Sequence, residues 1–146
     1  MTVTRMKLAE TAPGPSAAFA AVDRSLREGP LDPVVRELVK IRASQLNGCV
    51  YCLDLHAAEA RRNGEGEDRL LQLAVWPESE LFTEAERAAL AYTDQATRLV
   101  DGVDDPTWEA LAEHFTPEEI GALVAQVALI NAYNRIGVPT RRRPGD

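Results

Sequence analysis

The sequence has few of the features that would assign it to a class at once. Its 146 residues include only two cysteines and two histidines, and acidic residues outnumber basic ones by 23 to 16, giving a formal charge of −7. This balance disfavours nucleic acids and anionic membranes as partners, because both bind through basic patches. The longest uncharged run, 120–134, is shorter than the roughly 20 apolar residues of a membrane span. No apolar segment follows Met1–Lys7 as in a secretion signal, so we expect a soluble cytoplasmic protein.

The sequence does contain the residues that typically mark the starts and ends of helices. Asp32 before Pro33 is typical of a helix start, and Thr83 and Thr116 each begin a capping box. These signals predict seven helices, over residues 16–27, 33–46, 49–62, 67–74, 84–102, 105–115 and 117–136. Nothing in the chain favours a strand. We therefore expect an all-α single-domain bundle of about six to seven helices over residues 1–146. Its core is expected at about 17–137, with irregular, flexible ends at 1–14 and 141–146.

The last predicted helix is apolar on nearly every side from Ile120 to Ile130. Such a helix is buried either in a core or in a subunit interface. Because a domain of this size has difficulty surrounding it alone, the pattern predicts a homo-oligomer in which this region is buried partly between subunits.

The candidate site lies where both cysteines and one histidine fall within eight residues. Cys49 and Cys52 are three apart and His56 follows four later, so a helix would place all three on one face. Gly48 ends one predicted helix and Cys49 opens the next, where unpaired N–H groups favour thiolate over thiol. The spacing also suits a reversible disulfide. His56 is within reach either to take the proton of Cys52 or to stabilise its thiolate, which indicates a redox site.

A third group should orient His56, and Glu37 is the best candidate. It lies on the preceding helix between Val34 and Ile41, on an otherwise apolar stripe where a carboxylate is costly unless it is paired. If the two helices pack antiparallel, Glu37 comes near His56; burial would then raise its pKa and allow it to relay protons. The alternative is that Glu37 is an ordinary solvated helix residue.

A metal site is the main rival interpretation of the cysteine pair. A structural zinc needs about four ligands. Only Cys49, Cys52 and His56 cluster in the sequence, so Glu37 or His114 would have to complete the set. His114 is more readily explained as a cation at a helix C-terminus. We therefore expect no bound metal and no bound cofactor.

These residues resemble a known family. Glu37, Cys49, Cys52 and His56 match the E-x11-C-x2-C-x3-H signature of the alkylhydroperoxidase AhpD-like branch of the carboxymuconolactone decarboxylase superfamily. The segments 41–49, 82–90 and 131–135 are also similar to that branch, and the resemblance covers about residues 17–137.

The resemblance implies an all-helical trimer or hexamer that reduces hydroperoxides with its cysteine pair. Electrons would come from a dithiol carrier such as a lipoylated protein. Carried over, Cys49 and Cys52 are the redox pair, and Glu37 and His56 are the proton relay. Proximity to His56 favours Cys52 as the attacking thiol, whereas the helix N-terminus favours Cys49.

One departure from the family pattern bears on how active the protein is as a peroxidase. Some members have histidine immediately before the second cysteine, where this chain has Tyr51. Two other functions remain open from the sequence. The first is a non-catalytic, oligomeric, redox-responsive binding protein. The second is lactone decarboxylation, although the decarboxylase branch lacks the cysteine pair.

Overall fold

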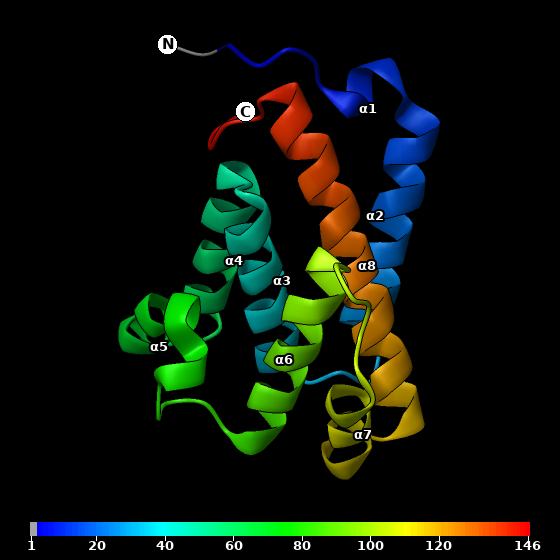
Figure 1. Cartoon of the computed structure of the whole chain (residues 1–146). Coiled ribbons are helices and arrows are strands. Elements are labelled where there is room, and N and C mark those ends of the chain that lie inside the picture. Colours follow the sequence, from blue (N-terminus) through cyan, green and yellow to red (C-terminus); the bar gives the residue numbers. More distant parts are fainter. Residues whose placement is uncertain (1–2) are drawn as a thin grey trace.

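The computed structural model describes residues 3–146, and every regular element in that range is helical. The elements are α1 (Leu8–Thr11), α2 (Pro13–Arg27), α3 (Pro33–Asn47), α4 (Val50–Arg62), α5 (Glu67–Gln72), the 3₁₀ helix η1 (Leu73–Glu78), α6 (Glu84–Arg98), α7 (Asp105–His114) and α8 (Pro117–Thr140). The predicted all-α single-domain fold is confirmed (Figure 1). None of the helices formed by residues 3–146 combines the length and apolarity needed to cross a bilayer.

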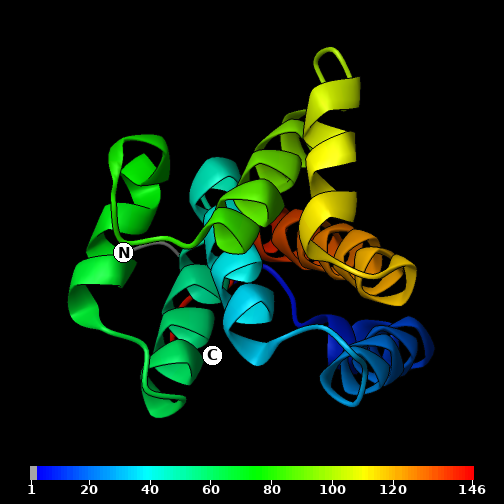
Figure 2. The same cartoon turned by 90° about the horizontal axis from the view of Figure 1, so that it is seen from below.

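Helix α3 is the centre of the bundle. It packs against α4, α6 and α8, and Figure 2 shows it in cyan between α4 and α6, with α8 in orange to one side. One apolar cluster joins α3 to α6, α7 and α8, and a second joins it to α4, η1 and α6. A third, smaller cluster consists of Ala43, Cys49, Cys52 and Ile130. Because α3 contributes to all three clusters, it fixes α4 relative to α8, and the cysteine pair lies between those two helices.

The predicted helix starts follow from local capping. The Asp32 side chain accepts a hydrogen bond from the backbone N–H of Val34 at 2.7 Å, and Pro33 occupies the first turn. Thr83 and Glu86 form the reciprocal capping box at the start of α6. At the start of α8 the Thr116 side chain accepts a hydrogen bond from the Glu119 N–H at 3.2 Å, which is one half of the predicted capping box. Each cap satisfies N–H groups that a helix start leaves without a partner.

Several predicted boundaries were wrong. Residues 8–11 form α1 and α2 begins at Pro13, because prolines are tolerated in a first helical turn and do not mark irregular chain there. The helix predicted over 67–74 is divided into α5 and η1. Helix α6 ends at Arg98, four residues before the predicted end, where Leu99 takes the left-handed cap conformation. Helix α8 continues past the predicted end at Ile136 to Thr140, with Gly137 and Pro139 inside it.

The apolar middle of α8 is buried, as predicted, but the reason given for burial was incomplete. Leu123, Val127, Leu129 and Ile130 are at most 5% exposed within a single chain. Helices α2, α3, α4, α6 and α7 all pack against α8, so one domain does surround most of it. The homo-oligomer therefore remains a prediction that this helix no longer supports.

Candidate active site

A left-handed glycine brings the cysteine pair to the start of α4. Gly48 ends α3 with φ of 69°, a conformation that other residues adopt at a cost. Cys49 is then the N-cap residue of α4, which begins one position after the predicted start, and its Sγ accepts a hydrogen bond from the Cys52 N–H at 3.4 Å. Cys49 and Cys52 are joined by a disulfide, with Cα atoms 5.4 Å apart. The predicted pairing is therefore present.

The backbone of α8 lies directly against this disulfide. A Cβ atom added to Gly137 would lie 2.9 Å from Cys49 Sγ and 3.8 Å from Cys52 Sγ. Real Cβ contacts are almost never that short. Only glycine therefore lets α8 pass this close to the sulfur atoms.

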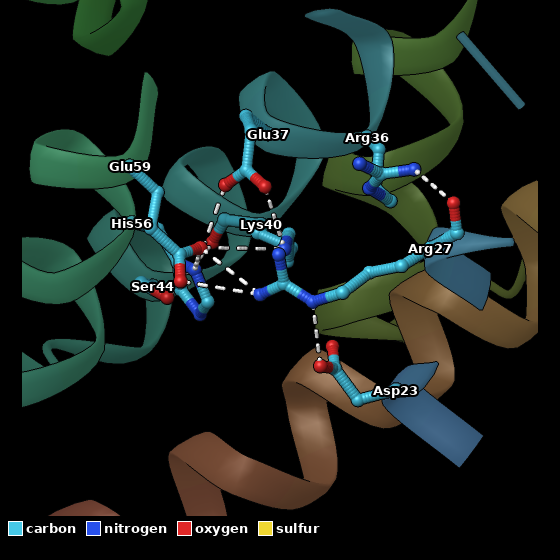
Figure 3. A network of polar contacts seen from close by, with 8 residues as sticks. All are labelled: Asp23, Arg27, Arg36, Glu37, Lys40, Ser44, His56 and Glu59. Carbon is cyan, nitrogen blue, oxygen red and sulfur yellow. Dashed lines mark hydrogen bonds and ion pairs between the residues drawn. The ribbon is translucent and has the colours of Figure 1, made fainter. Parts of the chain in front are cut away.

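His56 lies one turn after Cys52 and is held by two carboxylates. Its Nδ1 is 3.1 Å from Glu59 Oε2 and 3.6 Å from Glu37 Oε2 (Figure 3). Glu37, on α3, has a side chain only 3% exposed, so the predicted approach of α3 and α4 does bring it to the histidine. Val34, expected on the same buried stripe, is 41% exposed. Glu59 is the nearer partner and was not predicted.

A buried lysine completes the cluster. Lys40 is 1% exposed, and its Nζ lies 2.8 Å from Glu37 Oε1 and 3.8 Å from Glu59 Oε2. On the outer side, Arg27 Nη2 approaches Glu59 Oε1 to 3.1 Å (Figure 3). Charges taken out of water require such pairing, since an uncompensated buried ion costs several kcal/mol.

The cluster lowers the pKa values of both carboxyl groups and raises the pKa of the histidine. Burial alone would raise the pKa of Glu37, but the neighbouring His56 and the positive charge of Lys40 outweigh it and leave that pKa lowered. The predicted raised pKa for Glu37 is therefore wrong. The hydrogen bond from His56 is the main cause that brings the pKa of Glu59 to about 2. For His56, burial acts to lower the pKa, but hydrogen bonding to Glu37 and Glu59 overcomes it and raises the pKa.

A pocket of about 350 Å³ opens onto Cys52 and His56. Its walls come from α2, α4 and α8 and from both ends of the chain, and they include Phe19, Tyr51 and Tyr133. Cys49 does not line this pocket within the described range 3–146. A small molecule in the pocket therefore meets Cys52 first, which favours Cys52 over Cys49 as the reacting sulfur.

The structure brings Glu37 to His56 and joins Cys49 to Cys52, and His56 and Cys52 line the same pocket. Sequence reasoning missed Lys40 and Glu59, although each lies three positions after a predicted residue on the same helix face. It also missed the residues supplied by the far end of the chain. The tail was expected to be loose, yet the Arg142 guanidinium lies 3.8 Å from the centre of the Tyr51 ring. A local sequence pattern cannot predict a contact between two residues that are 91 positions apart.

Metal binding has one geometric candidate among residues 3–146. Ligand atoms of Glu37, His56 and Glu59 all lie within 4.8 Å of one another. The Lys40 ammonium already lies against both carboxylates and supplies a positive charge there. The expectation that no metal binds remains a prediction.

Residues 13–95, more than half of the chain, match the carboxymuconolactone decarboxylase family. The chain belongs to this family. Among its relatives, the uncharacterized protein YdfG of Bacillus subtilis (strain 168) is 32% identical over 140 residues, which cover 95% of each chain.

Solved structures narrow the position within the carboxymuconolactone decarboxylase family. A crystal structure from Agrobacterium tumefaciens, of a protein of unknown function provisionally assigned to antioxidant defence as AhpD, is 34% identical. It superposes with a TM-score of 0.95 over 99% of each chain. The debrominase Bmp8 shares only 20% identity, with a TM-score of 0.83 over 92% of this chain and 73% of its own, and shows the fold alone. The chain is thus a member of the AhpD-like branch.

We expect the His56 imidazole to titrate above the ordinary value of 6.5, and Glu59→Gln to lower its pKa because the charged acceptor at 3.1 Å is lost. NMR titration of the ring measures this, and His114→Asn removes the only other histidine signal. A His56 pKa unchanged by Glu59→Gln would contradict the described cluster.

The same shifts set a pH window for stability. A raised His56 pKa stabilises the fold fully below 6.5, and this contribution disappears as the pH rises through the folded value. Lowered Glu37 and Glu59 pKa values stabilise it above 4.5, and this contribution disappears as the pH falls toward about 2 for Glu59. The stability lost in Glu59→Gln should therefore be largest between 4.5 and 6.5, measured by denaturant unfolding across pH.

We expect Gly137→Ala to destabilise the oxidised protein by about 1–3 kcal/mol, because the added methyl group overpacks the disulfide. Gly121→Ala is the matched control on the same helix, where a Cβ meets nothing within 4 Å. That control should be neutral or stabilising by about 0.5–1 kcal/mol. Denaturant unfolding of both variants checks this, and equal effects would contradict the proposed close approach of α8.

Proposed function

We propose that the protein is a thiol-dependent hydroperoxide reductase that cycles Cys49 and Cys52 between dithiol and disulfide. The observation that carries the proposal is a disulfide whose Cys52 lines a pocket together with His56, a histidine with a raised pKa. Membership of the AhpD-like branch supports the same chemistry.

In the first step, the Cys52 thiolate attacks one oxygen of the hydroperoxide. The new S–O bond forms as the O–O bond breaks, and the sulfur is oxidised to a sulfenic acid while the leaving alkoxide takes a proton. His56 holds its proton to higher pH than an ordinary histidine, so it is suited to stabilise the thiolate as a cation and then to donate that proton. Of the two roles left open by the sequence, the geometry supports this one.

In the second step, the Cys49 thiol attacks the sulfenic sulfur of Cys52. The S–S bond forms, the S–O bond breaks and water leaves, so that two thiols and one hydroperoxide yield a disulfide, an alcohol and water. The Cα separation of 5.4 Å already suits the bridge, so no large backbone movement is required.

The cycle closes when an external dithiol reduces the disulfide by thiol exchange. Cys52 is the accessible sulfur, so the mixed disulfide forms there and Cys49 is the thiol that leaves. A lipoylated carrier protein is the reductant class that the family resemblance suggests. We place this activity in the cytoplasm, where such thiol pairs are kept reducible.

We expect purified protein to consume cumene hydroperoxide when dihydrolipoamide is the only reductant. Cys52→Ser should abolish turnover, and Cys49→Ser should stop after one equivalent because no disulfide can form. His56→Gln should lower kcat by about 10²–10⁴-fold, as expected for loss of a positioned acid–base group.

The control for this assay is the bare exchange reaction between dihydrolipoamide and the protein disulfide, followed by intact mass. If exchange proceeds and peroxide is not consumed, the non-catalytic redox-responsive alternative replaces the proposal. If activity on a lactone acid survives loss of both cysteines, the decarboxylase alternative replaces it.

We also propose a homo-oligomer, a trimer or a hexamer, on the basis of the family resemblance. Exposed apolar side chains such as Leu71 and Val75, at 78% and 57% exposure, are available for such contacts. Light scattering at micromolar concentration should give three or six times the mass of one chain, and a monomer mass would contradict this.

A further inference from the structure

The pocket over Cys52 has an apolar wall and a separate positive group at the side. Phe19, Leu55 and Ile136 line it together with Tyr51 and Tyr133. At about 350 Å³ the pocket is larger than the reacting peroxide group alone requires. Its shape therefore fits an organic molecule with an apolar body.

Arg142 contributes the positive group. Its backbone N–H donates to the Gly137 carbonyl at 3.0 Å, which fixes the residue just after the end of α8. The guanidinium carbon lies 3.8 Å from the centre of the Tyr51 ring, so the group stacks on the residue between the two cysteines. Its Nε is buried and finds no hydrogen-bond partner among residues 3–146.

The other charges at this pocket are already engaged or remain in solvent. Arg27 is paired with Asp23 and Glu59, and Lys7 and Glu10 are exposed. Over the described residues 3–146, no carboxylate comes within ion-pair distance of the Arg142 side chain. Asp146 is near enough for Arg142 to help lower its pKa, but Asp146 is fully exposed and binds Thr4 and the Arg143 N–H. Arg142 thus keeps donors available for a ligand.

A guanidinium whose face is stacked presents its N–H edge, and that edge matches the two oxygens of a carboxylate. We propose that Arg142 binds the carboxylate of the oxidising substrate, so that the preferred substrates are hydroperoxides of apolar carboxylic acids. This rests on the proposed hydroperoxide reduction, and it adds the substrate class. Tyr51 links the anchor to the reaction, because the ring under Arg142 belongs to the turn that carries Cys52.

Binding tests the anchor without any reaction. Octanoate and its neutral isostere octanamide are titrated by calorimetry into the oxidised full chain. We expect octanoate to bind about 10- to 100-fold more tightly, the difference expected for a hydrogen bond to a charged group. Arg142→Gln should remove this preference and Arg142→Lys should keep part of it. Arg143→Gln, an exposed neighbour in the same tail, should leave it unchanged.

Turnover tests the same preference in the reaction. With dihydrolipoamide as the neutral reductant, kcat/KM is compared for a fatty-acid hydroperoxide and its methyl ester. The acid-to-ester ratio should be about 10–100 in the wild type, fall toward 1 in Arg142→Gln, and persist in Arg143→Gln. Replacing dihydrolipoamide by dihydrolipoate shows whether the carboxylate site serves the reductant instead, in which case the preference appears with the dithiol and not with the peroxide.

The outcomes separate the two proposals. Loss of all peroxide turnover with a retained octanoate preference would overturn the reductase and leave the anion site standing. Peroxide turnover with no preference for acids, or a preference that survives Arg142→Gln, would overturn the anion site alone. Thermal unfolding of each variant verifies that it is folded, and Arg142→Lys keeps the test valid if Arg142→Gln is unstable.

Discussion

The site depends on one buried ionic cluster between α3 and α4. Glu37 and Glu59 place two carboxylates against one histidine, and burial makes unpaired charges there costly. Lys40 neutralises part of that negative charge from inside the bundle, while Arg27 acts on Glu59 from outside. Hydrogen bonding to the two carboxylates favours the protonated form of His56, which is why its pKa is raised despite burial.

This charge balance bears directly on the proposed chemistry. A neutral histidine would act on Cys52 by removing its proton, whereas a protonated one stabilises the thiolate that forms and returns a proton to the leaving oxygen. The cluster favours the protonated form of the histidine, and Glu37 contributes to this by its contact with the ring. A lysine in the cluster also makes a separate metal ion unnecessary for charge compensation.

Most of the helices could be predicted from short-range patterns in the sequence. Caps at Asp32, Thr83 and Thr116 predicted helix starts that the structure confirms, because a cap depends only on neighbours within one turn. The prediction that Cys49, Cys52 and His56 come together likewise required only the geometry of a helix. Helix ends were predicted less well: α8 continues four residues past its predicted end, through Gly137 and Pro139.

The parts that could not be predicted are contacts made across the whole chain. Gly137 lies against a disulfide that ends 85 residues earlier in the chain, at Cys52, and no neighbour in sequence indicates this contact. The tail looked loose because its composition is polar, and nothing near Arg142 in sequence indicates the aromatic ring on which it stacks.

These two long-range features share one cause. Extension of α8 from the predicted end at Ile136 to Thr140 adds four residues, or about 6 Å of helix at 1.5 Å per residue. That added turn contains Gly137, which lets the helix pass the sulfur atoms, and its carbonyl holds the backbone of Arg142. A side chain at position 137 would therefore act on both the disulfide and the position of the guanidinium. The last turn of α8, which the sequence prediction left out of the helix, therefore joins the redox pair to the proposed anion anchor.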